Sequence, residues 1–153
     1  MKKILVALFA GIFLLSCSSI NISTSSIKNS LSKRFDGEQN FYIFKAETKV
    51  TKVFIENRKL NIEVELKLKK LEKPIVALIE TELKYNLPKL YATNAYIKSV
   101  SNVEYEKIVK ELFNIIAKTV LFNNEILDVR EKINPDKVKD IYVGEKAIVV
   151  EFK

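Results

Sequence analysis

The chain has 153 residues, which suits one domain, and its 26 Lys and Arg against 19 Asp and Glu give a net charge of +7. It contains no histidine and only one cysteine. This composition excludes histidine-based catalytic triads and histidine-ligated metal sites, so we expect a protein that is not an enzyme and holds no metal. Beyond residue 16 the only glycines are Gly37 and Gly144, and we therefore expect no glycine-rich phosphate loop and no cofactor.

The N-terminal segment has the pattern of a secretion signal. Lys2 and Lys3 precede an apolar run from Ile4 to Leu15, which has the length of a signal-peptide core and is too short to span a bilayer. The run leads into Leu14-Leu15-Ser16-Cys17, which resembles the lipobox of bacterial lipoproteins. The resemblance implies cleavage before Cys17 and attachment of lipid, with acyl chains such as palmitate, to that cysteine. An ordinary signal peptide or N-terminal anchor with an incidental cysteine is the alternative.

Such a lipid would anchor the mature chain in the bacterial cell envelope. Ser18 after the cysteine, rather than Asp, implies the outer membrane, with the protein facing the periplasm. We divide the chain into a signal peptide (residues 1–16), a lipidated tether (17–26) and a single domain (27–153). Loss of Lys2 and Lys3 with the signal peptide leaves a net charge of +5, dispersed along the chain, and we expect no nucleic-acid partner.

The first part of the domain is predicted to be one short helix followed by strands. Ser23 or Thr24 is a suitable N-cap for a helix whose apolar stripe is Ile27, Leu31 and Phe35, and which ends at a turn near Asp36-Gly37. Alternation of apolar and polar residues then predicts four long antiparallel strands, with one face exposed to solvent. These strands cover residues 42–55, with a phase slip near Val53 typical of a β-bulge, and residues 60–68, 77–85 and 91–100.

The strongest helical pattern follows these strands. Ser101 and Glu104 have the spacing of a capping box, and apolar periodicity continues to about Phe122. About 21 residues at 1.5 Å each give a rod of roughly 31 Å. Because the apolar residues fill about half of the helix circumference, we expect the sheet to wrap around it. The tail predicts a short extended piece at 126–129, a brief helix that begins at Asn134-Pro135-Asp136, and a hairpin of 141–143 with 147–152.

Two pairs of carboxylates alternate with apolar residues on the predicted strands. These are Glu63 with Glu65 and Glu80 with Glu82. Paired carboxylates can hydrolyse glycosides, but lysines lie among these residues on the polar face. We therefore expect a solvated face of mixed charge. Asp36 and Glu38 are too few ligands for a calcium site, and we expect only a turn there.

Taken in this order, the elements resemble the YceB-like family of bacterial lipoproteins. The resemblance covers the first helix, the charged strand 64–71, the helix 105–122, the segment 126–131 and the closing segment 141–152. A departure is the short connection Glu56-Asn57-Arg58-Lys59, where the family can carry an insertion. The family is similar in fold to the tubular lipid-binding (TULIP) superfamily, which implies an α+β fold. In that fold a strongly curved antiparallel sheet wraps one long amphipathic helix.

The superfamily resemblance implies binding of acyl chains or other elongated apolar molecules in a groove between helix and sheet. The residues that we expect to line this groove are Leu66, Leu68, Ile79, Leu83, Leu112, Phe113, Ile115 and Ile116. The alternative is a tethered structural or interaction module with a fully packed core, which would bind another envelope protein. Both hypotheses describe a binding protein without catalytic residues.

Overall fold

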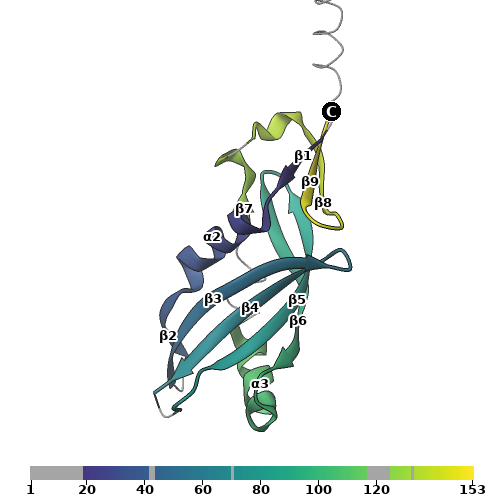
Figure 1. Cartoon of the computed structure of the whole chain (residues 1–153). Coiled ribbons are helices and arrows are strands. Elements are labelled where there is room, and N and C mark those ends of the chain that lie inside the picture. Colours follow the sequence, from purple (N-terminus) through teal and green to yellow (C-terminus); the bar gives the residue numbers. More distant parts are fainter. Residues whose placement is uncertain (1–18, 42–43, 70, 117–124, 132) are drawn as a thin grey trace, which may run out of the picture.

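The computed structural model describes residues 19–41, 44–69, 71–116, 125–131 and 133–153 as two antiparallel sheets and two α-helices in one elongated body (Figure 1). The larger sheet has six strands in chain order: β2 (Gly37–Phe41), β3 (Phe44–Glu56), β4 (Lys59–Leu68), β5 (Ile75–Asn86), β6 (Lys89–Val100) and β7 (Glu125–Asp128). The smaller sheet has the order β1 (Ser19–Ile22), β9 (Ile148–Phe152) and β8 (Val138–Val143).

The four predicted long strands are confirmed as β3 to β6, and the predicted phase slip is a register shift between Val50 and Lys52. The hairpin in the tail is confirmed as β8 and β9, and the extended piece before it as β7. The brief helix is a 3-10 turn, η4 (Pro135–Lys137), capped by the Asn134 side chain, which accepts a hydrogen bond from the amide of Asp136. A second 3-10 turn, η3 (Val129–Glu131), follows β7.

Two edge strands were not predicted. β2 occupies Gly37–Phe41, directly after the expected turn, and β1 occupies Ser19–Ile22 inside the predicted tether. Ser19-Ile20-Asn21-Ile22 does alternate polar and apolar residues, but over only four positions, and Gly37–Phe41 shows no alternation. Such short signals are weak, and an edge strand can be held by backbone hydrogen bonds to one neighbour. The part of the chain that could act as a tether is therefore shorter than residues 17–26.

The first helix, α2 (Thr24–Phe35), begins and packs as expected. Ser23 is its N-cap and accepts a hydrogen bond from the amide of Ser26. Ile27 and Leu31 are buried, and the helix contacts β3 and β7. The helix therefore covers part of the inner face, by which we mean the side of the six-stranded sheet whose side chains join the core.

The prediction of a long second helix enclosed by the sheet is wrong. In the described part of the chain, a 3-10 turn, η1 (Val103–Tyr105), leads into α3 (Glu106–Ile116), which has 11 residues, and the predicted continuation to Phe122 lies outside the described residues. α3 contacts β6 and lies at the far end of the sheet from β1 (Figure 1). The predicted capping box does not form either, because the Ser101 hydroxyl accepts from the amide of Val76, while Asn102 caps the turn.

The prediction of a TULIP-like fold is also wrong, because the sheet does not wrap a long helix in the described part of the chain. The six-stranded sheet is curved, but the core against its inner face is built by α2, β7 and the three-stranded sheet, which contribute Ile27, Ile126, Val138, Ile148 and Val150. Of the apolar side chains described on η1 and α3, only Val109 is buried. Helical periodicity indicates that a helix has an apolar side. It does not indicate which part of the sheet that side packs against.

Candidate functional site

The four sheet residues expected to line a groove all lie on the inner face, but the structure does not bring them together. Ile79 is buried, whereas Leu66, Leu68 and Leu83 are half-buried against the core. Leu66 lies opposite Ile75, and Leu83 is eight positions further along β5. At about 3.3 Å per residue this separation is roughly 26 Å, so Leu83 belongs to the opposite end of the sheet.

The helical half of the expected lining is described only in part. Leu112 is half-buried on α3, whereas the side chains of Phe113, Ile115 and Ile116 lie outside the described residues. Cys17, the expected lipidation site, also lies outside them.

Burial of the inner face falls along β4 toward its C-terminal end. Ile62, Ile79 and Ile97 lie side by side across β4, β5 and β6, and are only 2, 6 and 8% exposed. The next row toward α3 is Val64, Ala77 and Val100, in which only Ala77 is buried. Beyond it, Leu66, Leu68 and Leu71 are all half-buried. We call Val64, Leu66, Leu68, Leu71 and Val100 the half-buried end of the inner face.

A cleft of about 330 Å³ borders this half-buried end. Leu68 and Leu71 contribute apolar walls, and the charged lining comes from Glu38, Lys45, Glu47, Lys67 and Lys69. The cleft therefore combines apolar surface with charges of both signs.

The carboxylates expected on a solvated face are not equivalent. Glu80 is only 6% exposed and lies in a cluster on the outer face of the sheet, whereas Glu82 is exposed. The Tyr96 hydroxyl donates to Glu80 Oε1 at 2.5 Å, and Lys59 Nζ lies 3.2 Å from the same oxygen. Lys98 Nζ bridges Glu80 Oε2 at 3.1 Å and Glu56 Oε2 at 2.8 Å.

These contacts explain the electrostatics of the cluster. The hydrogen bond from Tyr96 and the contacts with Lys98 and Lys59 lower the pKa of Glu80 to about 2, although burial acts in the opposite direction. The same hydrogen bond raises the pKa of Tyr96. An ionised carboxylate surrounded by three donors is suited to holding β4, β5 and β6 together, whereas a general acid needs a raised pKa. The Glu63 carboxylate is likewise engaged, since Thr51 donates to it at 2.7 Å.

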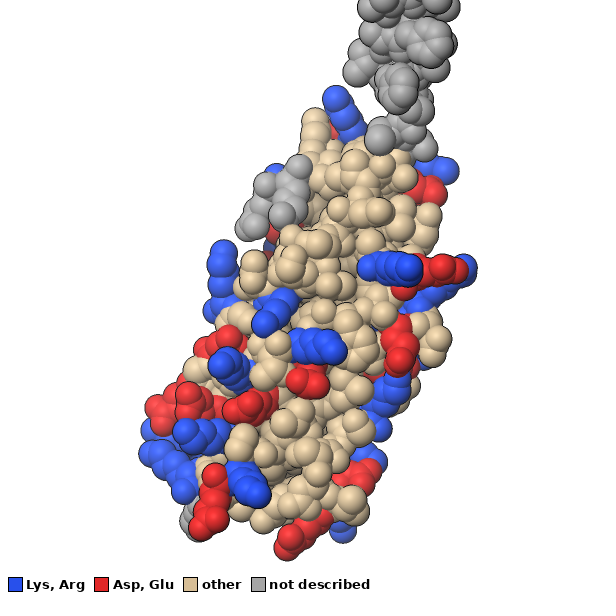
Figure 2. Space-filling view, in the orientation of Figure 1, with Lys and Arg blue, Asp and Glu red and all other residues tan. Residues whose placement is uncertain are grey.

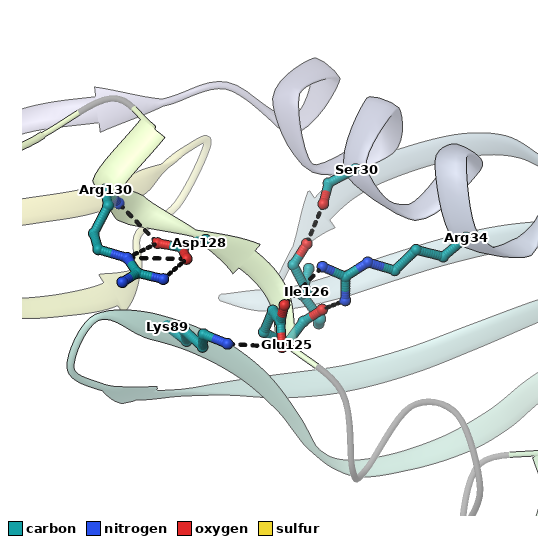
Figure 3. Close-up of polar contacts among 7 residues, drawn as sticks. All are labelled: Ser30, Arg34, Lys89, Glu125, Ile126, Asp128 and Arg130. Carbon is teal, nitrogen blue, oxygen red and sulfur yellow. Dashed lines mark hydrogen bonds and ion pairs between the residues drawn. The ribbon is translucent and has the colours of Figure 1, made fainter.

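A second polar cluster attaches β7 to its neighbours (Figure 3). From α2, Ser30 donates to the carbonyl of Ile126 at 2.6 Å, and Arg34 donates to the carbonyl and the carboxylate of Glu125. From β6, Lys89 Nζ lies 3.3 Å from the same carboxylate. Through these contacts, β7 is held between the first helix and the edge of the six-stranded sheet.

Arg130 forms a separate contact just after β7. Its guanidinium group donates two hydrogen bonds to Asp128 Oδ2 and one to Oδ1, and these bonds lower the pKa of Asp128 to about 2.

Among the described residues, no group of three or more Asp, Glu, Cys or His side chains is placed to hold a metal ion. Within the same ranges, no helix is both long and apolar enough to cross a membrane.

No protein-family model matches the chain, and no curated protein matches it. The resemblance to YceB-like lipoproteins therefore stays a prediction from the sequence.

Proposed function

We propose that this protein is a bacterial envelope lipoprotein, anchored through lipid on Cys17 in the outer membrane and facing the periplasm. We further propose that it binds a lipid or another elongated apolar molecule and is not an enzyme. The lipobox pattern supports the anchor. The observation that carries the binding proposal is the fall in burial along β4, from the fully buried Leu60 and Ile62 to the half-buried Val64, Leu66 and Leu68.

A row of half-buried apolar side chains along β4 favours an apolar ligand. Covering the remaining apolar surface with such a ligand gains about 25 cal/mol per Å² removed from water. Val64 and Leu66 lie on one strand, with Val100 two strands away in the same row as Val64. Val64, Leu66 and Leu68 follow one another along β4, so the half-buried surface is elongated along this strand, which suits a long ligand better than a compact one. The ligand would lie against the half-buried end rather than between a long helix and an enclosing sheet.

The test is a titration of residues 18–153 with a long-chain fatty acid that carries an environment-sensitive fluorophore. Leu66→Gln places an amide on the proposed binding surface, and we expect it to weaken binding by about 1 to 2 kcal/mol, or roughly tenfold. Lys49→Gln is the matched control, because Lys49 is exposed on the outer face of β3 and does not line the cleft. Equal affinity of both variants and of the unchanged protein would count against this surface as the binding site.

A protein-interaction module is the second candidate, and a different observation favours it. Val103 is 80% exposed and Ile108 is 51% exposed at the α3 end, although both are apolar. Crosslinking in intact cells tests this candidate. Recovery of one stoichiometric envelope protein, lost on Val103→Ser but not on Lys107→Ser, would favour the interaction module over the lipid-binding protein.

A further inference from the structure

The distance between the proposed anchor and the folded domain is very short. β1 begins at Ser19, two residues after Cys17. Two residues of fully extended chain span at most about 7 Å. The inference that follows rests on the proposed lipidation of Cys17. With the lipid in the bilayer, the start of β1 cannot move far from the membrane surface.

The strand pairing shows what lies beside the start of β1. Ser19 pairs with Glu151 at the end of β9, and Phe152 pairs with Val138 at the start of β8. The amide of Lys153 donates to the carbonyl of Lys137 at 3.0 Å. We call this part of the three-stranded sheet the β1 end. Figure 1 shows the start of β1 and the C-terminus together there, with α3 at the opposite end of the molecule.

The side chains of the β1 end suit a lipid headgroup region. Ile20 is one of the exposed large apolar residues, and Lys137, Lys139 and Lys153 are exposed. Lys139 is paired with Glu151 at 3.4 Å, whereas Lys137 and Lys153 make no ion pair with the described residues. The exposed Asp136 precedes Lys137 and adds one negative charge to this end. Lysines beside a bilayer attract anionic headgroups, and an apolar side chain at the same level can enter the interface.

The long sides of the molecule are less suited to this contact. Figure 2 shows Lys and Arg interspersed with Asp and Glu over the face in view, rather than a region of one charge. On the outer face of β3 and β4, Lys49 lies opposite Glu65 and Glu47 lies opposite Lys67. Mixed charges give little net attraction to an anionic surface. A molecule lying flat on the bilayer would have to desolvate these charges without compensation.

We propose that the anchored protein stands with its β1 end on the bilayer, with Lys137, Lys153 and Ile20 at the headgroups, and with α3 directed away from the membrane. β5 has 12 residues, which at 3.3 Å each make a strand of roughly 40 Å. The α3 end, with the exposed Val103, is thereby held well above the lipid. The half-buried end of the inner face lies toward the same distal side.

The test uses the full chain, produced with its lipid and reconstituted into vesicles of phosphatidylglycerol and phosphatidylethanolamine. A fluorophore is attached at Lys153→Cys or at Lys107→Cys, which replace exposed lysines at the β1 end and on α3 respectively. A nitroxide on the lipid headgroups then quenches any fluorophore near the surface. We expect a marked loss of emission from position 153 and none from position 107. Equal quenching at the two positions, or stronger quenching at 107, would overturn the orientation.

Two further measurements separate this inference from the anchor itself. Peptide mass spectrometry of the same preparation shows whether Cys17 carries acyl chains. A Cys17 without lipid would overturn the anchor and the orientation together, whereas acylated Cys17 with equal quenching would overturn the orientation alone. Ten Gly and Ser residues inserted between Ser18 and Ser19 have a reach of about 17 Å, and we expect them to reduce the quenching at 153. Unchanged quenching would show that chain length does not hold the β1 end at the bilayer.

Discussion

Tyr96 and Glu80 lie directly opposite each other on β6 and β5, and the Tyr96 hydroxyl donates a 2.5 Å hydrogen bond to the Glu80 carboxylate. The carboxylate also contacts Lys59 from β4 and Lys98 from β6, and Lys98 reaches Glu56 on β3. One buried acidic group therefore connects three adjacent strands directly and a fourth through Lys98. The cluster is the main polar attachment on the outer face near the β3–β4 hairpin.

Replacing this acid should destabilise the protein. We expect Glu80→Gln to lower the free energy of unfolding by about 1 to 3 kcal/mol, because two lysines lose their shared counter-charge while the site stays buried. Glu82→Gln is the control, since Glu82 is exposed two positions along the same strand and surface changes of this kind usually stay within about 0.5 kcal/mol. Urea unfolding measures both, and equal losses for the two variants would contradict the role of the cluster.

The same cluster predicts a pH dependence. The pKa of Glu80 is lowered from 4.5 to about 2 in the folded protein. A lowered pKa means that the unfolded chain binds the proton more readily. The contribution of Glu80 is therefore complete above about pH 4.5 and is lost as the pH falls toward 2. The difference in unfolding free energy between the unchanged protein and Glu80→Gln should shrink over this range. A difference that stays constant from neutral pH to about pH 2.5 would contradict the prediction.

The attachment of β7 gives a local prediction. Arg34→Ala removes the donor that binds both the carbonyl and the carboxylate of Glu125, and we expect a loss of about 1 to 2 kcal/mol. Hydrogen exchange should become faster at the amides of Ile126 and Leu127, because β7 lies at the edge of its sheet. Lys33→Ala changes the preceding exposed residue of α2 and should leave these amides protected. Unchanged exchange in Arg34→Ala would show that Ser30 and Lys89 hold β7 without it.

The anchor gives a prediction in cells. Cys17→Ser removes the only thiol of the chain, so no lipid can be attached to that sulfur. We expect the variant to lose incorporation of labelled palmitate, and cleavage before residue 17 should stop. Ser16→Ala keeps a small residue before the cysteine and serves as the control, with lipidation retained. Palmitate incorporation that persists in Cys17→Ser would contradict the interpretation of Leu14-Leu15-Ser16-Cys17 as a lipobox.

Several elements were predictable because their signals are local. Ser23 caps α2, Asn134 caps the 3-10 turn η4, and Ile27 and Leu31 are buried at helical spacing. The alternation that slips near Val53 corresponds to a register shift just before it. Each of these features depends on residues close together in the chain, and the sequence pattern therefore contains what is needed to predict them.

The candidate site depends on packing between distant segments, which the sequence pattern does not specify. Val109 is buried and Ile108 exposed on the same apolar side of α3, because the helix meets β6 at the end of the sheet rather than under it. Leu66 and Leu83 share a face but lie at opposite ends. The sequence pattern does not distinguish the buried Glu80 from the exposed Glu82, because the pairing of Glu80 with Tyr96 depends on the strand register. The strand registers place Leu66, Leu83 and Glu80, and the contact of α3 with β6 places Val109. No local sequence pattern specifies either.

The most direct test of the proposed function is native mass spectrometry of residues 18–153 purified under gentle conditions from bacterial cells that produce them. The chain then carries no lipid of its own at Cys17, so any acyl-chain mass belongs to a bound ligand. We predict a complex with one apolar molecule, which is abundant in the unchanged protein and in Lys49→Gln and depleted in Leu66→Gln. A protein that is entirely free of ligand, and that also fails to take up added fatty acid or phospholipid, would contradict the proposal.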